Sequence, residues 1–332
     1  MALTQTVLDQ AWARHANLDV YEVRSKNYGF FNQAQKNGDV LVGRDVVKKK
    51  KSLDQDVVVA VLNKGHVGSN GGRVIGTIPT ALGTSAKVTL ATQTFQRHFS
   101  IQPMENYINE ISYHRELARV MKELQLQLLG DIEAYIYATV NAARSQADNS
   151  GAYPIVLDAF QVPNTDYEDV LAQIDAIYRT NDYAGAQIKI VANPMYAAVV
   201  SKILEFSANN SQNKSMRVVG KDINFSSAIT PAGKHELMVS TDMGYEIMNF
   251  NEPDAVMKTR KDEAEYKETI NLPLLGMKFG LYAQKSYVAN DAGSASTLME
   301  SYSVATDVTV VTPYLSTPAT DPAPNTKFEL LA

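Results

Sequence analysis

One long amphipathic segment, from Asn109 to Ala147, limits the folds open to this chain. Its apolar residues recur at intervals of three and four, which places them on one face of an α-helix. These residues are Leu117, Val120, Met121, Leu124, Leu128, Ile132, Tyr135, Ile136, Val140 and Ala143. The charged residues Arg115, Glu116, Arg119, Lys122, Glu123 and Glu133 are assigned to its other faces. A helix of about 35 residues is roughly 50 Å long, so the segment predicts a spine along which sheets and shorter helices pack.

Two strand-like segments precede this spine. Residues from Asp56 to Asn63 are rich in β-branched side chains, and a second segment extends from Lys87 to Ile101. The second segment changes its apolar face near Ala91, which indicates a bulge or a strong twist. The glycine-rich stretch from Lys64 to Gly72 lies between the two segments. The sequence therefore predicts a long hairpin that projects from the body of the molecule.

The start of the chain is basic, whereas the remainder is acidic. Residues 1 to 51 hold nine of the 31 Lys and Arg and five of the 36 Asp and Glu, in a chain with a formal net charge of −5. This asymmetry favours a basic arm that contacts an acidic surface, either nucleic acid or another copy of the chain. The four consecutive residues Lys48, Lys49, Lys50 and Lys51 are its candidate contacts with DNA or with such a surface. A solvated charged arm without a partner is the alternative.

The basic region contains one predicted helix. Residues Leu3 to Asn17 place Val7, Leu8 and Trp12 on one stripe, which indicates a short helix that docks on another element. Residues 18 to 51 show no long periodic pattern and are interrupted by glycines, so they predict an extended arm.

An α/β stretch is expected after the spine. Thr165 and Glu168 form a capping box, which predicts a helix that begins at about residue 166. Residues Ile188 to Ala192 predict a short buried strand, and Asn193 with Pro194 predicts the N-terminus of the next helix. Further strands are predicted over Glu236 to Ser240, Tyr245 to Phe250, Asp254 to Thr259 and Leu272 to Ala289.

The composition changes after Asn290. Residues 292 to 332 are rich in Ser, Thr and Pro, and they hold too few large apolar residues to fold alone. Tyr302 to Val311 predicts one strand that pairs with an open sheet edge, and the proline-rich stretch from Thr317 to Asn325 is expected to lie extended. Because the core elements are expected to precede this tail, its removal is expected to spare subunit folding.

No spacing in the sequence indicates catalysis or ligand binding. The chain has no cysteine, and no Gly-Lys-Ser/Thr sequence opens a helix after the glycines near residue 70. The histidines His15, His66, His98, His114 and His235 form no pair at ligand spacing and are interpreted as surface or packing residues. The acidic residues near 166 to 169 are explained by helix capping, and the mixed charges over 258 to 268 by an exposed face or a subunit contact. We therefore expect no catalytic residue, no cofactor and no metal, in a protein that is not an enzyme.

The order of elements resembles the Hong Kong 97 type major capsid protein of tailed bacteriophages. The residues that carry the resemblance are Val88 to Ser100 leading into Asn106 to Asn141, then Ile188 to Phe206, and finally Gly244 to Asn290. The resemblance covers roughly residues 20 to 290 and rests on architecture rather than on a sequence motif. It implies an α+β fold with an N-terminal arm, a projecting hairpin, a spine helix, a peripheral sheet domain and an axial α/β domain.

The resemblance also implies domain boundaries and a function. The expected parts are an arm over residues 1–53, an extended hairpin loop over 54–102, a spine helix of the peripheral domain over 103–150, an axial domain over 151–243, returning strands over 244–291 and a C-terminal extension over 292–332. The implied function is a structural subunit that assembles into pentamers and hexamers of an icosahedral shell around double-stranded DNA, in a virion whose protein is made in the bacterial cytoplasm. Portal, scaffolding and decoration proteins are implied as partners, and no membrane is involved. The residues expected at intersubunit contacts are Lys64, Phe95, Phe99, Tyr302 and Val308.

Two other interpretations remain open at this point. An encapsulin-type compartment has the same fold and holds protein cargo, although the basic arm favours nucleic acid. A two-domain α/β hydrolase or sugar-binding protein would account for residues 151 to 290, but it would leave the hairpin and the spine unexplained.

Overall fold

The computed structural model describes most of the helices and strands of the chain. The described residues are 3–15, 27–37, 57–62, 85–90, 92–146, 171, 174–176, 178–179, 187–198, 216–218, 221–230, 234–242, 244–250, 265–289, 296–312 and 325–331. They form a mixed structure of helices and sheets. No helix within these ranges is both long enough and apolar enough to cross a lipid bilayer.

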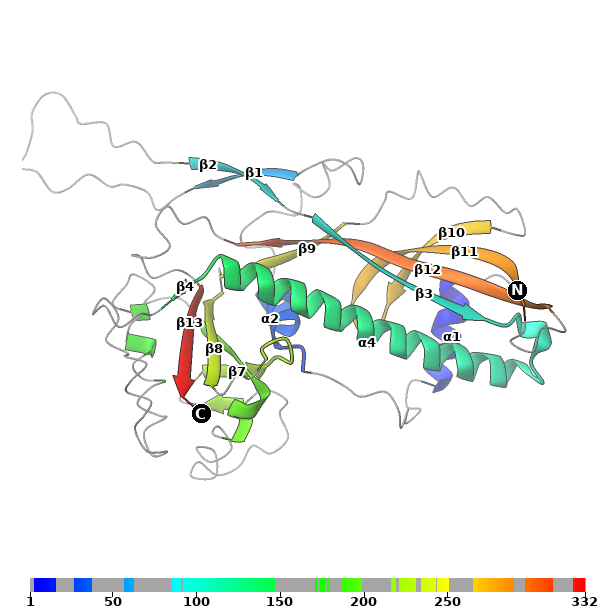
Figure 1. The fold of residues 1–332 in the computed structure, drawn as a ribbon, viewed down its shortest axis with the longest axis horizontal. Helices are drawn as coiled ribbons and strands as arrows, with labels where there is room; N and C mark the ends of the chain where they lie inside the picture. The colour runs from blue at the N-terminus through cyan, green and yellow to red at the C-terminus, as the bar shows by residue number, and fades with distance from the viewer. Residues whose placement is uncertain are drawn as a thin grey trace, which may run out of the picture.

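The predicted spine is present as helix α4, Glu110–Ala142. It begins where Asn109 accepts a hydrogen bond from the backbone N–H of Ser112 at 2.8 Å, which satisfies one of the free donors of the first turn. The helix runs along the length of the molecule in Figure 1, with apolar residues such as Leu117, Ile132 and Ile136 fully buried. The prediction of a long amphipathic helix is therefore confirmed.

The main core lies between α4 and a five-stranded sheet. In this sheet β10 (Glu265–Leu272), β11 (Met277–Ala289), β12 (Ser296–Val311) and β3 (Thr92–Ile101) follow one another, and β9 (Glu246–Phe250) also pairs with β12. All of these pairings are antiparallel. The predicted alternation along β11 is confirmed, because Met277, Phe279, Leu281 and Ala283 are buried while Lys278 and Tyr282 are exposed.

The position of β12 corrects the expectation for the C-terminal residues. Tyr302 to Val311 is a strand, as predicted, but it lies in the middle of the sheet and not at its edge. One side of β12 pairs with β3, and the other side pairs with β11 and then with β9. The core elements therefore do not all precede residue 290.

The second sheet has six strands and lies near the C-terminal end of α4 (Figure 1). In spatial order its strands are β4 (Ser145–Gln146), β13 (Asn325–Leu331), β8 (Lys234–Thr241), β5 (Ile188–Ala192), β7 (Lys221–Phe225) and β6 (Met216–Val218). Strand β5 has the predicted bounds and is buried throughout. Asn193 caps the following turn by accepting from the N–H of Tyr196 at 3.1 Å, as predicted, although the first turn there is the 3-10 helix η3, Pro194–Tyr196. The described residues Leu171, Ile174 and Tyr178 are helical, in agreement with the helix expected after residue 166.

The first part of the second predicted hairpin strand pairs with the first strand. Strand β1 (Val57–Leu62) and strand β2 (Ser85–Leu90) form an antiparallel two-stranded sheet in which Val57 is opposite Leu90. The rest of that segment, β3, pairs instead with β12 in the five-stranded sheet, and Ala91, where a bulge or a strong twist was expected, lies outside the described residues.

The N-terminal region contains two helices among its described residues. Helix α1 (Gln5–His15) agrees with the prediction and buries Val7 and Leu8. Helix α2 (Gly29–Asn37) does not, because residues 18 to 51 were expected to be extended. Phe30 and Phe31 supply the reason, since both are almost fully buried against the rest of the molecule and fix a helix that the sequence pattern does not indicate. A short 3-10 helix, η1 (Met104–Asn106), lies between β3 and α4.

Candidate functional site at the junction of spine, α2 and second sheet

The carboxyl group of Glu133 joins three separate parts of the chain. Its residue is 2% exposed on α4, and its two oxygens accept hydrogen bonds from the backbone N–H groups of Phe30 at 3.0 Å and Phe31 at 2.7 Å. The hydroxyl of Ser226, just after β7, donates to the same carboxyl group. The N–H groups of Phe30 and Phe31 belong to the first turn of α2, where no partner exists within the helix. Tyr28 directly precedes α2, and its side chain is not of a kind that caps a helix. Glu133 therefore caps α2 from a different element.

A close backbone contact allows α2 to reach this position. A Cβ atom at Gly29 would lie 2.6 Å from the carbonyl oxygen of Phe225 and 2.9 Å from Cγ1 of Val191. Only a glycine fits such an approach between helix and sheet. The residues before α2 are also held in place. The N–H of Asn27 donates to Oγ of Ser227, and the N–H of Ser227 donates to the carbonyl oxygen of Asn27, both at 2.9 Å. The start of α2 is thus held by the spine and by the second sheet together.

Burial dominates the electrostatics of the junction. Removal of the Glu133 carboxyl from water raises its pKa from 4.5 to about 7, although the hydrogen bonds from Ser226, Phe30 and Phe31 act in the opposite direction. Tyr245 is fully buried beside it, and its hydroxyl donates to the carbonyl oxygen of Phe30 at 3.1 Å. Burial, followed by the negative charge of Glu133, holds the pKa of Tyr245 well above its usual value. The phenol stays neutral, and the carboxyl group is the titrating member of the pair.

The sequence interpretation placed Glu133 on a polar face of the spine, and this assignment is wrong. The residue lies four positions after Leu129 and three before Ile136, both buried, so the helical spacing itself indicates the apolar face. A carboxylate on the buried face of a helix was the signal that marks this site. Its partners could not be identified, because Phe30 and Phe31 are about a hundred positions away and lie in a segment expected to be extended.

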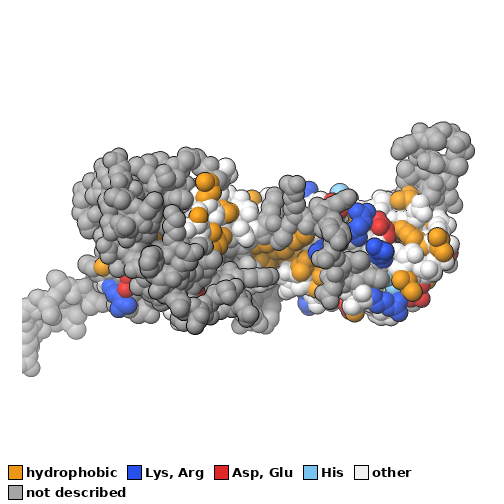
Figure 2. All heavy atoms as spheres, turned by 90° about the horizontal axis from the view of Figure 1, so that it is seen from below, with side chains coloured by type: hydrophobic (Ala, Val, Ile, Leu, Met, Phe, Trp, Pro, Cys, Tyr) orange, Lys and Arg blue, Asp and Glu red, His pale blue; other side chains and the backbone are white. Residues whose placement is uncertain are grey.

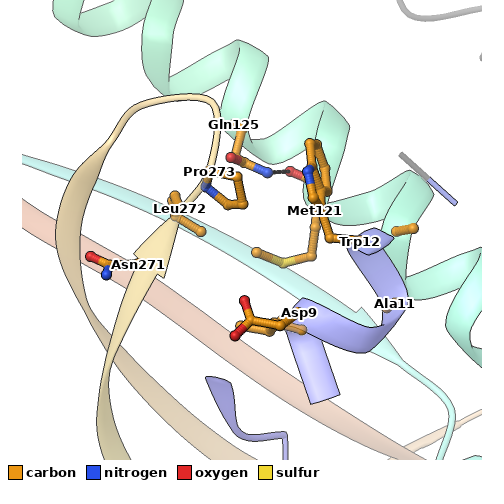
Figure 3. Close-up of a pocket in the computed structure, with 10 residues that line it drawn as sticks. Asp9, Ala11, Trp12, Met121, Gln125, Asn271, Leu272 and Pro273 are labelled. Atoms are coloured by element: carbon orange, nitrogen blue, oxygen red, sulfur yellow. Dashed lines mark hydrogen bonds between the residues drawn. The ribbon is translucent and has the colours of Figure 1, made fainter. Parts of the chain in front are cut away.

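Helix α1 contacts both β10 and the spine. The side chain of Gln5 accepts from the N–H of Asn271 at 2.7 Å, and Arg14 lies 3.0 Å from Nδ1 of the buried His114. His114 is a packing histidine, in agreement with the sequence interpretation. Figure 3 shows Trp12 of α1 and Met121 of α4 in the small apolar pocket that α1, α4 and the β10–β11 connection enclose. Of the polar side chains in that wall, Gln125 donates to the carbonyl oxygen of Met121 and accepts from the N–H of Leu274, and Asp9 accepts from Gln5 at 2.7 Å.

Of the residues expected at intersubunit contacts, four are described, and they pack within the chain itself. Phe95, Tyr302 and Val308 are buried within the chain, and Phe99 stacks on Tyr302 with ring centroids 5.0 Å apart. Elements of the same chain cover these side chains, so their burial requires no neighbouring subunit. Lys64 and the run Lys48 to Lys51 lie outside the described residues.

Other apolar side chains are exposed instead. Ile108 is 97% exposed and Ile111 is 61% exposed, both at the start of α4. Figure 2 shows hydrophobic side chains beside basic and acidic ones at this end of the molecule. The residue before a helix cap commonly packs on the fourth helical residue, which here is Tyr113. Tyr113 is buried beside Tyr107, whereas Ile108 remains almost fully exposed.

Within the described part of the chain, no three His, Asp or Glu side chains are close enough together to hold a metal ion. Of the mixed charges near residue 262, those from Glu265 onward lie on β10, a strand that the sequence interpretation did not predict.

Comparisons with known proteins give a result at the level of the fold. No protein-family model matches the chain, and no curated protein matches its sequence. Among solved structures, a chain from Mycobacterium phage Che8 has a TM-score of 0.50 at 10% identity, over 92% of this chain and 93% of that one. A chain from the capsid of Ralstonia phage GP4 has a TM-score of 0.49 at 9% identity, over 95% and 93% of the two chains. One from the capsid of the cyanophage P-SCSP1u has a TM-score of 0.42 at 10% identity, over 84% and 83%. The resemblance expected from the order of the elements is therefore confirmed at the level of the fold, which the chain shares with a solved phage structure.

Proposed function

We propose that this chain is the major structural subunit of a phage capsid of the Hong Kong 97 type. The observation that carries the proposal is the shared fold with a phage structure over 92% of the chain. In this role the chain assembles into pentamers and hexamers of an icosahedral shell that encloses double-stranded DNA. It acts as a building block and not as an enzyme, and it works with portal, scaffolding and decoration proteins of the virion.

The proposal assigns a part to each region of the chain. Residues 1–53 form the arm, 54–102 the extended hairpin loop and 103–150 the spine of the peripheral domain. Residues 151–243 form the axial domain, residues 244–291 return through both domains, and residues 292–332 are the C-terminal extension. The two sheets and the connecting spine support a peripheral and an axial domain, since α4 reaches from one end of the five-stranded sheet to β4 of the six-stranded sheet. Strands β3 and β12 also belong to the five-stranded sheet, so parts of residues 54–102 and 292–332 contribute to the peripheral domain.

The exposed end of the spine supports self-association. Ile108 and Ile111 offer apolar surface to another molecule, and the ion pairs Arg14 to Glu110 and Arg119 to Glu116 place both signs of charge nearby. A surface of mixed charge around an apolar centre can contact a second copy of itself without repulsion.

Electron microscopy of the purified full-length chain tests the proposal. We expect closed shells of uniform diameter that sediment as one large species and contain nucleic acid. Replacing Ile108 by Asp is expected to reduce the yield of shells severalfold while the subunit remains folded, because a charge would replace exposed apolar surface. The matched control is Gln127→Asp, an exposed position farther along the same helix, which is expected to assemble normally.

Each alternative has its own outcome. Shells that contain one protein cargo and no nucleic acid would identify an encapsulin-type compartment. A chain that stays monomeric or dimeric at every concentration, with or without a scaffolding partner, would contradict the proposal and favour the two-domain enzyme or sugar-binding protein.

A further inference from the structure

The segment before the spine holds one isoleucine in a fixed and exposed position. Ile108 is 97% exposed. On its N-terminal side, the N–H of Tyr107 donates to the carbonyl oxygen of Met104 at 3.1 Å. On its C-terminal side, Asn109 accepts from the N–H and the hydroxyl of Ser112 at 2.8 and 2.9 Å. A turn and a helix cap therefore hold Ile108 in place, so that it forms a preorganised apolar knob.

The molecule also has an apolar pocket that opens to the surface between α1, α4 and the β10–β11 connection. Figure 3 shows Trp12 of α1, Met121 of α4 and Pro273 of the connection around it. Trp12 is half-buried and Pro273 is exposed, so both belong to the rim. The space in and around the pocket is about 280 Å³, which is below the usual size of a site for a drug-sized ligand. The pocket therefore suits one small aliphatic group.

The knob cannot fill the pocket of its own chain. Ile108 directly precedes the cap of α4, and Met121 lies on the same helix thirteen positions later. At the helical rise, this separates the knob from the pocket wall by about 20 Å. Because one continuous helix carries both, an Ile108 side chain can reach this pocket only from a second copy of the chain.

The charges near the knob and near the pocket are complementary. Glu105 and Glu110 are exposed on either side of the knob. On α4, Ala118 lines the pocket, and Arg115 and Lys122 lie three positions before it and four positions after it. This spacing places both basic residues on the same side of the helix as the pocket. An acidic knob and a pocket with basic neighbours attract each other, which favours contact between two copies.

We propose that Ile108 of one copy inserts into the pocket between α1, α4 and the β10–β11 connection of a second copy. The two surfaces differ, so the contact is head-to-tail, and each copy gives a knob to one neighbour and a pocket to another. Contacts of this kind close into rings when the rotation between copies allows it. The proposal rests on the proposed function, because it needs an assembly of many copies.

Cysteine cross-linking of the full-length chain tests this contact. The natural chain has no cysteine, so every thiol in a variant is an introduced one. In the double variant Ile108→Cys/Pro273→Cys, oxidation of the assembled protein is expected to give a ladder of covalent multimers on a non-reducing gel. The two cysteines of one chain are too far apart to pair with each other. Each single variant is expected to give no cross-link. The matched control Ile108→Cys/Ala134→Cys, whose second cysteine is exposed on the other half of α4, is expected to give none either.

The single tryptophan provides a second readout that requires no cysteine. Trp12 lines the pocket, is half-buried and is the only tryptophan of the chain. In the wild-type protein, assembly is expected to reduce the quenching of Trp12 fluorescence by acrylamide severalfold, because the knob of a neighbour closes the pocket. In Ile108→Ala, most of this protection is expected to disappear.

The possible outcomes separate this contact from the proposed function. A ladder from the double variant together with protection of Trp12 supports the contact. A covalent dimer from Ile108→Cys alone would show that two knobs meet at a two-fold axis, and it would overturn the proposal. Shells that form without a ladder, or in which Trp12 stays unprotected, would overturn the contact and leave the proposed function intact. A chain that forms no assembly under any condition would overturn both.

Discussion

Two buried glutamines differ in how their polar atoms are satisfied. Gln33 on α2 is 0% exposed, and neither its side-chain oxygen nor its nitrogen has a hydrogen-bond partner among the described residues. Gln125 on α4 is equally buried, but it donates to the carbonyl oxygen of Met121 and accepts from the N–H of Leu274 at 2.9 Å. A buried amide without partners destabilises the folded state, whereas a satisfied one does not.

The same substitution is therefore expected to have opposite effects at the two positions. Gln33→Met should raise the free energy of unfolding by about 1 to 2 kcal/mol, because methionine fills a similar volume without polar atoms. Gln125→Met should lower it by about 1 to 3 kcal/mol, because it leaves the N–H of Leu274 without an acceptor. Denaturant unfolding of both variants measures the difference. Equal destabilisation by both would mean that Gln33 has a partner after all.

At the residue scale, the sequence predicts what depends on near neighbours. The cap at Asn193 was predicted because its partner, Tyr196, is three positions away. The cap at Glu133 was not, because its partners lie about a hundred positions away and only the folded chain brings them together. Helical spacing shows which face of the helix a carboxylate occupies, but it does not show which hydrogen-bond donors from other elements pack against that face.

At the scale of elements, prediction succeeded where the signal lies within the element. Helix α4 and the alternating strand β11 have strong periodic patterns, β5 is a continuous run of apolar and β-branched residues, and all three are present. Helix α2 and strand β13 were missed, since nine and seven residues carry little periodic signal. Their stability comes from distant partners such as β8, to which β13 pairs over its whole length.

Two helix glycines make the same contrast testable. Gly29→Ala is expected to lower the free energy of unfolding by about 1 to 3 kcal/mol, because the new Cβ would press on the Phe225 carbonyl oxygen at 2.6 Å. Gly130→Ala, in the middle of α4, should raise it by about 0.5 to 1 kcal/mol, because nothing lies within 4 Å of its Cβ position. Thermal unfolding of the two variants checks both signs. A stabilising Gly29→Ala would mean that α2 can move away from the second sheet at little cost.

At the scale of the whole molecule, the C-terminal residues belong to the body of the fold. Strand β12 buries Tyr302, Val304 and Val308 in the core beneath the five-stranded sheet. Composition could not show this, because a segment rich in Ser and Thr is typical of a tail, and register with β3 and β11 is not visible in one sequence. The earlier expectation that removal of the tail spares folding is therefore replaced by its opposite.

Two truncations separate the contributions of the last strands. A chain ending at Asn290 lacks β12 and is expected to be insoluble or unfolded, because β3 and β11 would lose the strand between them. A chain ending at Thr312 keeps β12 and lacks β13, together with the buried ion pair of 2.8 Å between Lys327 and Glu236. We expect it to keep the five-stranded sheet with a loosened second sheet. Circular dichroism and limited proteolysis distinguish the two results, and a folded chain ending at Asn290 would contradict the central position of β12.

The central position of β12 also affects how the chain is made. Its pairing with β3 joins residues such as Thr94 and Asp307, which lie 213 positions apart. The ribosome therefore synthesises β3 and α4 long before β12, and the apolar faces of these two elements lack that strand in the meantime. Only a chain translated through β12 can close this core, because β12 lies between β3 and β11.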